Sequence, residues 1–427
     1  MTDSLTQITL PNGLKILLKE IHTAPIISSW LWYRVGSRDE TPGRTGISHW
    51  VEHMQFKGTP QFPANVLDKL ISREGGSWNA FTYMDWTAYF ETMPADKIDL
   101  ALRLESDRMT NSQFNADEVA SERTVIMAER EGSENEPLFQ LGETVQHAAF
   151  RVHAYHHEVI GDMADLRTMT RDDLYNHYRG YYVPNNAVMA VAGDFDTQTM
   201  MTRIRELFEP IPAGSEPSRL QRPEPTQNGE VRLSVEGPGA TTYVQACYRF
   251  PAASHPDFFA LSVLDSLLAG PSNLNMFSGG ISNKTSRLYR ALVDKQLAVS
   301  AHGGASATID PFLYSITMTI HPKRKPEEAL DALDKEIQRA REEKVSKEEI
   351  ARAIKQARAL FAYGSENISN QAFWLGYAEM FAAYEWFQTY LDKLAKVTVK
   401  DVQRVANEYF QNKSRVVGIY APTNGKA

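Results

Sequence analysis

The chain has 427 residues, a formal net charge of −8 and 42% hydrophobic residues, which predicts about two to four soluble domains and excludes a disordered chain. No apolar run approaches the ~20 residues that span a bilayer, and the excess of Asp plus Glu (53) over Lys plus Arg (45) argues against a nucleic-acid partner. The single cysteine, Cys247, excludes a disulfide framework and a cysteine-rich metal site, so any metal must be held by histidines and carboxylates.

The N-terminal segment is polar and then alternates over residues 8–16 around Pro11-Asn12-Gly13, a pattern typical of two strands joined by a turn. No secretory signal is present, so we expect a bacterial-type soluble protein of the cytoplasm, or of the periplasm if a leader has been removed. The apolar residues 26–35 then predict a strand, and residues 46–57 predict a helix.

The helix predicted over residues 46–57 carries the densest group of ionisable side chains, His49-Trp50-Val51-Glu52-His53. Because His49 and His53 are four residues apart, both imidazoles project from one face of a helix about a turn apart, which suits joint binding of Zn²⁺. Glu52 flanks that face, where a carboxylate can accept a proton from water without binding the metal. This order of residues is that of an inverted zincin. Two surface histidines on an amphipathic helix would give the same pattern.

The sequence after this helix predicts further strands and two more helices. Strands are expected over residues 77–92, after the pair Gly75-Gly76, and an amphipathic helix is expected over residues 95–109. Asn115, followed by Glu118 three residues on, has the capping pattern that opens another helix.

A third metal ligand is expected elsewhere, since a catalytic zinc usually has three protein ligands and leaves its fourth position to water. The helix that Asn115 opens carries Glu122 and Glu129, seven residues apart on one face. Residues 125–128 between them are apolar enough to be buried, and buried carboxylates need partners. Alternatively, both are solvated glutamates in a helix that also holds arginines.

The segment between Pro210 and Glu230 holds five prolines and no apolar periodicity, which predicts an interdomain linker. The elements on its two sides follow in the same order, as expected for a duplicated unit: the second half predicts a strand over 243–250, a helix over 258–269, strands over 300–319, a helix over 326–340 and a helix capped by Ser346 with Glu349. We therefore predict an α+β fold of two duplicated α/β sandwich domains, residues 1–212 and 230–427, joined by the linker 213–229.

A comparison of the two halves supports a metal site in the first half. Residues 258–270 fall on residues 46–58, and the two capped helices align on their first residues. All five candidate positions then change together: Leu261, Leu264 and Asp265 replace His49, Glu52 and His53, while Ala353 and Leu360 replace Glu122 and Glu129. A site present in only one half explains this pattern, whereas a merely solvated surface does not.

Over nearly its whole length the chain resembles the M16 metallopeptidases (pitrilysin and insulinase), in particular the short two-domain M16B type. The resemblance rests on four features: the run His49-Trp50-Val51-Glu52-His53-Met54-Gln55-Phe56-Lys57-Gly58-Thr59, Glu129 lying 76 residues beyond His53, the run Gly75-Gly76-Ser77-Trp78-Asn79-Ala80-Phe81-Thr82, and Ser286-Arg287-Leu288-Tyr289. It implies two domains of the LuxS/MPP-like metallohydrolase type, which form half of a clamshell around an extended substrate.

Each candidate residue gains a role from this resemblance. Glu52 is the catalytic general base, and Glu122 is a catalytic carboxylate that orients a metal ligand. One Zn²⁺ per chain is bound by three residues: His49, His53 and Glu129. An extended peptide substrate pairs with an exposed edge strand at three more: Asn79, Ala80 and Phe81.

The second half departs from the family pattern at one place. Similar active chains have an Arg and, seven residues on, a Tyr, which stabilise the substrate carbonyl, whereas this stretch is one residue shorter and has Val293 and Val299. Neither valine can donate a hydrogen bond. The resemblance therefore implies the zinc-bearing subunit of a heterodimer of the mitochondrial processing peptidase type, whose homologous M16B partner supplies the Arg and Tyr. Arg287 and Arg290 are alternative donors within this chain.

Two further features leave alternatives open. His153, His156 and His157 form a second histidine cluster, which is either another metal site or, as in similar stretches of the family, an ordinary loop. Residues 270–286 resemble the glycine-rich loop of noncatalytic partner subunits, and they form either a flexible surface loop or a loop that guides substrate.

We predict a zinc-dependent endopeptidase that hydrolyses peptides or unfolded polypeptide segments. The rival prediction is a noncatalytic scaffold or assembly subunit, similar to the respiratory-complex core proteins of the same fold. The intact residues His49, Glu52, His53 and Glu129 favour the enzyme, and the missing Arg and Tyr favour the scaffold.

Overall fold

The computed structural model describes residues 5–217, 219, 221–276 and 280–423, and it divides into two compact units. Unit 1 comprises Met1–Glu131, His157–Arg222 and Ser365–Tyr384, whereas unit 2 comprises Gly132–His156, Pro223–Gly364 and Glu385–Ala427. Each unit therefore takes a helical segment from the other half of the sequence. The predicted limits of the two domains, residues 1–212 and 230–427, stay a prediction. The exchange of helical segments between the two units was not part of that prediction.

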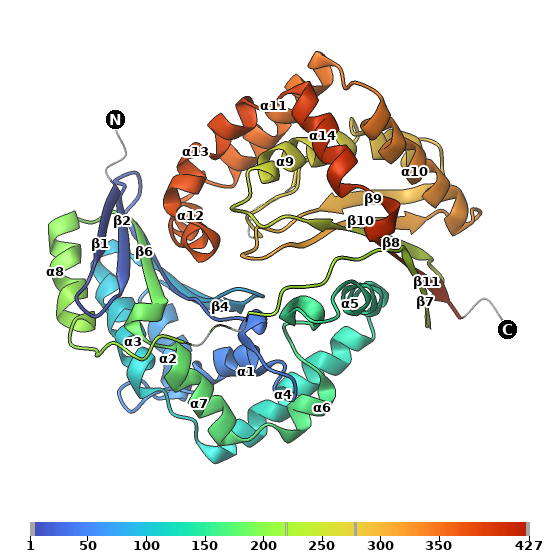
Figure 1. The fold of residues 1–427 in the computed structure, drawn as a ribbon. Helices are drawn as coiled ribbons and strands as arrows, with labels where there is room; N and C mark the ends of the chain where they lie inside the picture. The colour runs from blue at the N-terminus through green and yellow to red at the C-terminus, as the bar shows by residue number, and fades with distance from the viewer. Residues whose placement is uncertain (1–4, 218, 220, 277–279, 424–427) are drawn as a thin grey trace. The chain divides into compact units, whose positions relative to one another are not determined.

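The sheet of unit 1 is mixed (Figure 1) and consists of β1 Leu5–Thr9, β2 Lys15–Glu20, β3 Ile26–Tyr33, β4 Ser77–Thr82, β5 Thr87–Pro94 and β6 Ala187–Gly193. The strand order is β1-β2-β6-β3-β5-β4, in which β2 and β6 are parallel and the other neighbours are antiparallel. β1 and β2 form the predicted strand–turn–strand, and Gly13 in the turn has a φ of 90°, which glycine adopts without strain. Strand β4 lies at an edge of the sheet.

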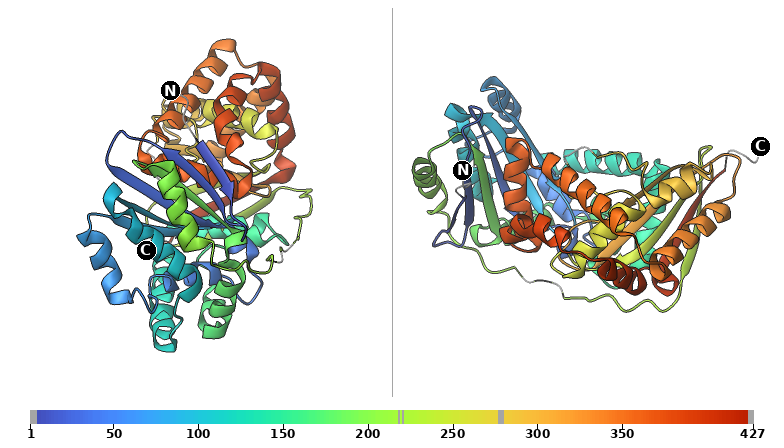
Figure 2. Two further views of the ribbon diagram at one scale, coloured as in Figure 1. Left: turned by 90° about the vertical axis from the view of Figure 1, so that its left-hand side faces the viewer. Right: turned by 90° about the horizontal axis from the view of Figure 1, so that it is seen from above.

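The helices of unit 1 are α1 Ile47–Met54, α2 Ala64–Arg73, α3 Ile98–Asn111, α4 Ala116–Glu134, α6 Met163–Thr168, α7 Arg171–Tyr181, α8 Thr197–Phe208 and α12 Ile368–Phe381. Of these, α3 and α12 pack on opposite faces of the sheet. On one face, the guanidinium of Arg108 on α3 lies 4.3 Å from the ring centroid of Tyr89. On the other, α12 packs along β3 with Phe373 5.5 Å from Trp32 (Figures 1 and 2). A Cβ on Gly376 would lie 2.0 Å from the Trp32 indole nitrogen, so this packing requires glycine.

The sheet of unit 2 repeats the pattern with β7 Val231–Gly237, β8 Tyr243–Phe250, β9 Ala298–Gly304, β10 Phe312–Ile320 and β11 Arg415–Pro422. Its order is β7-β11-β8-β10-β9, with β7 and β11 parallel and the other pairs antiparallel. Strand for strand this matches β2-β6-β3-β5-β4 of unit 1. The predicted duplication is therefore confirmed, and β9 is the counterpart of β4 at a sheet edge.

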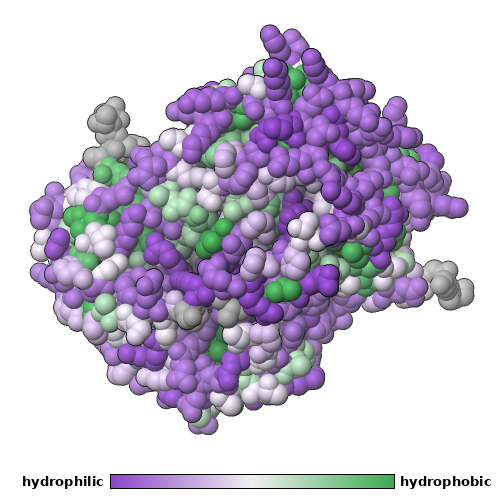
Figure 3. Space-filling model, viewed as in Figure 1, coloured by the Kyte–Doolittle hydropathy of each residue, from purple (hydrophilic) through white to green (hydrophobic). Residues whose placement is uncertain are grey.

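The helices of unit 2 are α5 Pro137–Ala149, α9 Asp257–Leu268, α10 Pro326–Glu342, α11 Lys347–Tyr363, α13 Tyr384–Ala395 and α14 Val399–Tyr409. Helix α5 packs on β11 and β7, where a Cβ on Gly418 would lie 2.5 Å from a methyl group of Val145. Helix α14 packs against both α9 and α10. The surface over α10, α11 and α14 is mostly hydrophilic (Figure 3). Helix α5, from the first half of the sequence, thus packs on the sheet of the second half, and α12, from the second half, packs on the sheet of the first half.

Most of the predicted elements are present with slightly shifted ends. The helix predicted over 46–57 is α1, and the one opened by Ser346 is α11, whose predicted cap is confirmed by the Glu349 N–H donating to the Ser346 hydroxyl. The cap predicted at Asn115 stays a prediction. Among the described residues no helix or strand lies between α8 and β7, in the predicted linker. None of the helices within those residues has the length and apolar character of a membrane span.

Candidate metal centre

Helix α1 presents two different faces, and this explains how it carries the site. Its apolar side chains recur at helical spacing and are buried, namely Ile47, Trp50, Val51 and Met54, while His49 and His53 stay partly exposed. The helix starts after Gly46, whose φ of 86° is in the left-handed region that favours glycine. The buried stripe therefore fixes the polar face of α1 toward α4 and β4.

The two histidines of α1 meet at a distance that fits a shared zinc ion. His49 Nε2 lies 3.2 Å from His53 Nε2. Two nitrogen ligands at ~2.05 Å from a tetrahedral zinc are about 3.3 Å apart, so the pair fits the metal. Burial, reinforced by the neighbouring His53, lowers the pKa of His49 to about 3, which keeps this imidazole neutral and its lone pair available.

Helix α4 adds the predicted third ligand. Glu129 Oε2 lies 3.8 Å from His53 Nε2, and among the described residues His49, His53 and Glu129 form a group whose ligand atoms all lie within 4.8 Å of one another. The expectation that residues 125–128 are buried is only partly right: Ile126 is buried, but Val125 is 48% exposed and the Glu129 side chain 49%. Glu129 therefore sits at the rim of the site, where water and substrate can reach it.

Glu122, two turns before Glu129 on α4, contacts the ring of His53 from behind. Its Oε1 lies 2.8 Å from His53 Nδ1, which leaves Nε2 of that ring directed at the metal site. Lys57 forms an ion pair with the other carboxylate oxygen. Burial alone raises the pKa of Glu122, but the hydrogen bonds to His53 and Lys57 outweigh it, so the net shift is downward. Glu122 is thus placed as an ionised acceptor for the Nδ1–H of His53.

Glu52 is held beside the two histidines by the edge strand. The hydroxyl of Thr82, the last residue of β4, donates to Glu52 Oε2 at 3.0 Å. Burial raises the pKa of Glu52, although His53 and the Thr82 hydrogen bond act in the opposite direction. A carboxylate with a raised pKa is better suited to accept and return a proton than an exposed glutamate. Thr82 and Lys57 were part of the sequence runs that carried the resemblance, but no role was predicted for either.

The predicted substrate-binding residues lie on β4. Asn79, Ala80 and Phe81 are consecutive there, and β4 is hydrogen-bonded only to β5 among the described residues. The opposite edge of β4 therefore faces no further strand among the described residues, as strand addition requires. Phe81 stacks on Phe90 of β5 with ring centroids 6.0 Å apart, which stiffens the pair of strands.

The valines that replace the expected Arg and Tyr lie in unit 2. Val293 ends a π-helical turn, Tyr289–Val293, and Val299 is 57% exposed on the edge strand β9. Arg287 is buried and forms two hydrogen bonds of 3.1 Å with the carboxylate of Glu349, so its guanidinium is already engaged. Arg290 is exposed. Of the two alternative donors, only Arg290 keeps an exposed side chain.

The second histidine cluster does not form a metal site among the described residues. His153 Nε2 lies 3.1 Å from Asp310 Oδ2, and His157 Nε2 lies 2.9 Å from Glu40 Oε2. The histidines are thus used in separate contacts within their own units. The loop predicted to be glycine-rich, 270–286, includes residues 277–279, which lie outside the described residues.

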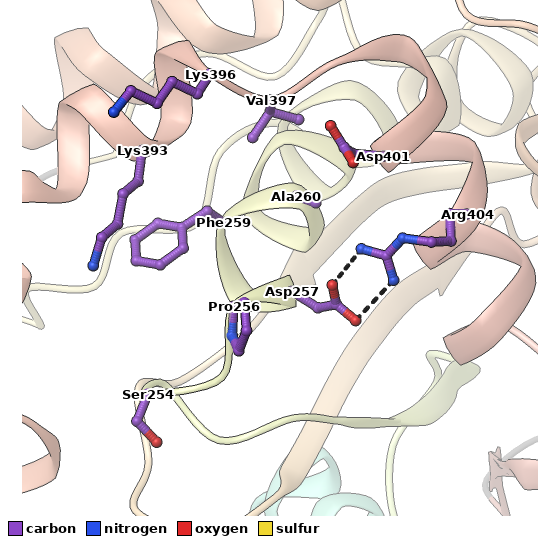
Figure 4. Close-up of a pocket in the computed structure, with 10 residues that line it drawn as sticks. All are labelled: Ser254, Pro256, Asp257, Phe259, Ala260, Lys393, Lys396, Val397, Asp401 and Arg404. Carbon is purple, nitrogen blue, oxygen red and sulfur yellow. Dashed lines mark hydrogen bonds and ion pairs between the residues drawn. The ribbon is translucent and has the colours of Figure 1, made fainter.

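A cavity of about 480 Å³ in unit 2, between α9, α13 and α14, is a less suitable site (Figure 4). Its acidic side chains are committed to structural contacts: Asp257 forms an ion pair with Arg404, and Asp401 accepts the N–H and hydroxyl of Thr398 at 2.9 and 2.6 Å. Lys393 lies over the ring of Phe259 at 4.8 Å. None of these residues belongs to a candidate metal group among the described residues.

Two family models match different parts of the chain. The family model described as Insulinase (Peptidase family M16) matches residues 15–163, and the one described as Peptidase M16 inactive domain matches residues 168–357. The chain is 32% identical to the zinc protease PqqE of Helicobacter pylori over 418 residues, which cover 95% of this chain and 90% of that protein. All five candidate metal-site residues lie in the first match, and both valines lie in the second.

The chain is also similar, at lower identity, to a peptidase subunit and to a protease of known structure. The chain is 26% identical over 431 residues to the probable mitochondrial-processing peptidase subunit beta of Arabidopsis thaliana, covering 97% of this chain and 78% of that one. The crystal structure of a protease from Helicobacter pylori superposes with a TM-score of 0.91 at 27% identity, covering 98% of this chain and 100% of that chain.

Proposed function

The chain belongs to the insulinase family of peptidases, M16, and we propose that it is a zinc-dependent endopeptidase acting on peptides or unfolded polypeptide segments. The observation that carries the proposal is the 3.2 Å approach of His49 Nε2 to His53 Nε2, with Glu129 beside them. These three residues would hold one zinc ion per chain. The chemistry that zinc would supply there is Lewis-acid polarisation of the scissile carbonyl and activation of a water nucleophile.

The protein's own residues supply the proton transfers and the orientation of the substrate. Glu52 takes the proton of the attacking water and returns it to the leaving amine, so that water and peptide become a carboxylic acid and an amine. Glu122 keeps His53 in the orientation and tautomer that its ligand role needs. Backbone groups of Asn79, Ala80 and Phe81 on β4 hold the substrate as an added strand.

A homologous partner chain completes the site in this proposal. Val293 and Val299 stand where similar active chains have an Arg and a Tyr, so a second chain would supply the donors for the substrate carbonyl. The same two valines favour the second candidate function, a noncatalytic scaffold subunit, as does the description of the second family match as inactive.

One experiment separates the two candidate functions. Zinc content is measured on the purified chain, and cleavage of a quenched peptide is followed with and without a homologous partner. An endopeptidase subunit should carry about one zinc per chain, removable by a chelator, and should cleave once the partner is present. Full occupancy without cleavage in any mixture would favour the scaffold.

A further inference from the structure

The first turn of helix α1 is held by a carboxylate from outside the helix. Glu40, in the preceding loop, accepts the backbone N–H of Gly46 with Oε2 and that of Ser48 with Oε1, each at 2.8 Å. The first N–H groups of a helix have no partners within it, and Gly46 at the N-cap position has no side chain to supply one. Glu40 therefore takes the place of the missing cap.

Glu40 is in turn bound by a histidine 117 residues away in the sequence. His157 Nε2 lies 2.9 Å from Glu40 Oε2, and because a carboxylate only accepts hydrogen bonds, the imidazole donates. The side chains of Glu40 and His157 are 0% and 1% exposed. Burial alone lowers the pKa of an imidazole, but the hydrogen bond and charge of Glu40 outweigh it and raise the pKa of His157. The two residues thus form a buried, hydrogen-bonded pair.

Further contacts lock the segment that carries this histidine against the start of α1. The hydroxyl of Thr45 donates to Asp165 Oδ2 at 2.7 Å and accepts the N–H of Asp162 at 2.8 Å. The backbones approach so closely that a Cβ on Gly46 would lie 2.4 Å from the carbonyl oxygen of Ile160. The first turn of α1 cannot shift without disturbing these contacts.

We propose that Glu40 and His157 are positioning residues of the metal centre, which hold the first turn of α1 so that His49 faces His53 before a metal binds. The inference rests on the proposed function, since it assigns the pair a purpose in zinc binding. Ser48, whose N–H Glu40 accepts, directly precedes His49. His53 has its own anchor in Glu122, so His49 is the ligand that depends on the pair.

The length of α1 explains why such a device is needed. The helix has eight residues, whereas isolated helices shorter than about 12 residues are marginal in water. Its buried face holds the middle of the helix, but without Glu40 the first turn can fray. Zinc binding would then have to reorder that turn, and loss of comparable supporting residues typically weakens metal affinity about 10- to 100-fold.

The second half of the chain provides a matched control. Asp257, the first residue of α9, forms an ion pair with Arg404 on α14 and accepts the Tyr409 hydroxyl at 2.9 Å (Figure 4 shows the ion pair). No residue of α9 belongs to a candidate metal group among the described residues. Arg404→Gln therefore loosens the first turn of the corresponding helix in the half without the metal centre.

The test uses the full chain and Zn²⁺ alone, with Glu40→Gln, His157→Gln, the double variant and Arg404→Gln. Hydrogen exchange of the metal-free proteins, followed by mass spectrometry, reports protection of residues 46–50. Competition with a chromogenic chelator gives the zinc dissociation constant. Circular dichroism confirms that each variant is folded, and Glu40→Asp, which keeps the charge but is too short to reach both N–H groups, is the substitute if Glu40→Gln does not fold.

We expect both single variants to lose protection at residues 46–50 by roughly tenfold or more and zinc affinity by about 10- to 100-fold. The double variant should be little worse, because the two residues act as one unit. Arg404→Gln should change neither quantity. Folded variants with wild-type exchange and affinity would overturn the inference while leaving the proposed function intact, whereas a wild-type chain that binds no zinc would overturn both.

Discussion

Helices α1 and α9 hold equivalent places in the two halves, each after the strand that neighbours the parallel pair, but they meet different surroundings. Every residue of α9 except Ser262 is buried, whereas α1 leaves His49 and His53 partly exposed. A metal site needs ligands that solvent and substrate can reach, so α1 cannot be closed over as α9 is. In the second half the corresponding helix does not have that requirement, and it is buried along almost its whole length.

The partner helices differ in the same sense. On α11, Ala353 and Leu360 are 2% and 3% exposed, and the backbone carbonyl of Ala353 accepts the Ser266 hydroxyl of α9 at 3.0 Å. On α4 the corresponding positions are Glu122, buried against His53, and Glu129, half exposed. Apart from Asp265 at the place of His53, both helices of the second half have thus lost the ionisable groups at the places where the first half gathers them. The comparison predicts one metal centre per chain.

The largest effect is expected at Glu52. Glu52→Gln keeps the shape of the side chain and the hydrogen bond from Thr82 but cannot accept a proton, so turnover should fall about 1,000-fold or more while zinc content stays near one per chain. Peptide cleavage and metal analysis on the same preparation measure both. The control is Leu264→Met at the corresponding place in α9, which should change neither. Parallel loss of metal and activity in Glu52→Gln would mean that Glu52 is structural.

The second-largest effect is expected at Glu129, whose counterpart in the second half is Leu360. Glu129→Gln removes the charge of the proposed third ligand, and zinc affinity should fall by more than the ~10- to 100-fold typical of residues that only support a ligand. Chelator competition measures the dissociation constant. Leu360→Met in α11 is the matched control and should retain wild-type affinity. Unchanged metal binding in Glu129→Gln would defeat its assignment as the third ligand.

The third prediction concerns the second half, which has Val293 and Val299 where similar active chains have hydrogen-bond donors for the substrate carbonyl. A partner chain that supplies one or both missing donors should raise turnover by about 100-fold or more, and it should raise kcat more than it changes peptide binding, since the donors act on the transition state. Titration of the purified chain with a candidate partner at fixed peptide concentration measures this. Full activity of the chain alone would contradict the heterodimer and point to Arg290. Val293→Arg with Val299→Tyr need not restore activity, because the stretch is one residue short.

The features of the fold and the site that follow from local periodicity could be predicted from the sequence. The spacing of His49 and His53 fixes their common face on any helix, and the repeated order of elements predicted two similar sheets. The edge position of β4 followed from the resemblance. The exposure of Glu129 could not be predicted, because the apolar residues around it suggested burial and only the packing of α4 leaves Val125 and Glu129 facing water.

Contacts distant in sequence account for what was missed. Helices α5 and α12 pack on the sheet of the other sequence half, and no local pattern distinguishes such a helix from one that stays with its neighbours. The Glu40–His157 pair joins residues 117 apart. His157 was noticed only as part of a histidine cluster, and its partner is a single glutamate in a polar loop.

A fourth prediction sharpens the comparison at Asp265, the counterpart of His53. Its carboxylate accepts the Tyr314 hydroxyl and the Ser272 N–H, both at 2.7 Å, and burial raises its pKa to about 6. Between pH 4 and pH 6 the folded form binds a proton that the unfolded form does not, so this group's stabilising contribution is lost as the pH rises, by about 3 kcal/mol for two pKa units.

Asp265→Asn removes that titration. The stability of the variant relative to wild type should therefore improve as the pH rises from 4 to 7, whatever its absolute sign, and denaturant unfolding of both proteins at the two pH values measures the difference. A relative stability that is independent of pH would contradict the shifted pKa. The corresponding residue in the first half is His53, a proposed metal ligand, so this buried acid is specific to the second half.

The smallest effect is expected at Thr82, where the edge strand of the first half contacts Glu52, the proposed general base. Thr82→Val keeps the shape of the side chain but removes the hydroxyl that donates to Glu52 Oε2. A hydrogen bond to a carboxylate contributes about 1.5–3 kcal/mol, and because Glu52 keeps its place on α1, only part of that should reach the transition state. We expect kcat to fall roughly tenfold with little change in KM, since the backbone of β4 that pairs with the peptide is untouched. Thr82→Ser retains the hydroxyl and should retain most of the rate. An equal loss in both variants would show that packing of the Thr82 methyl group, and not its hydrogen bond to Glu52, supports the centre.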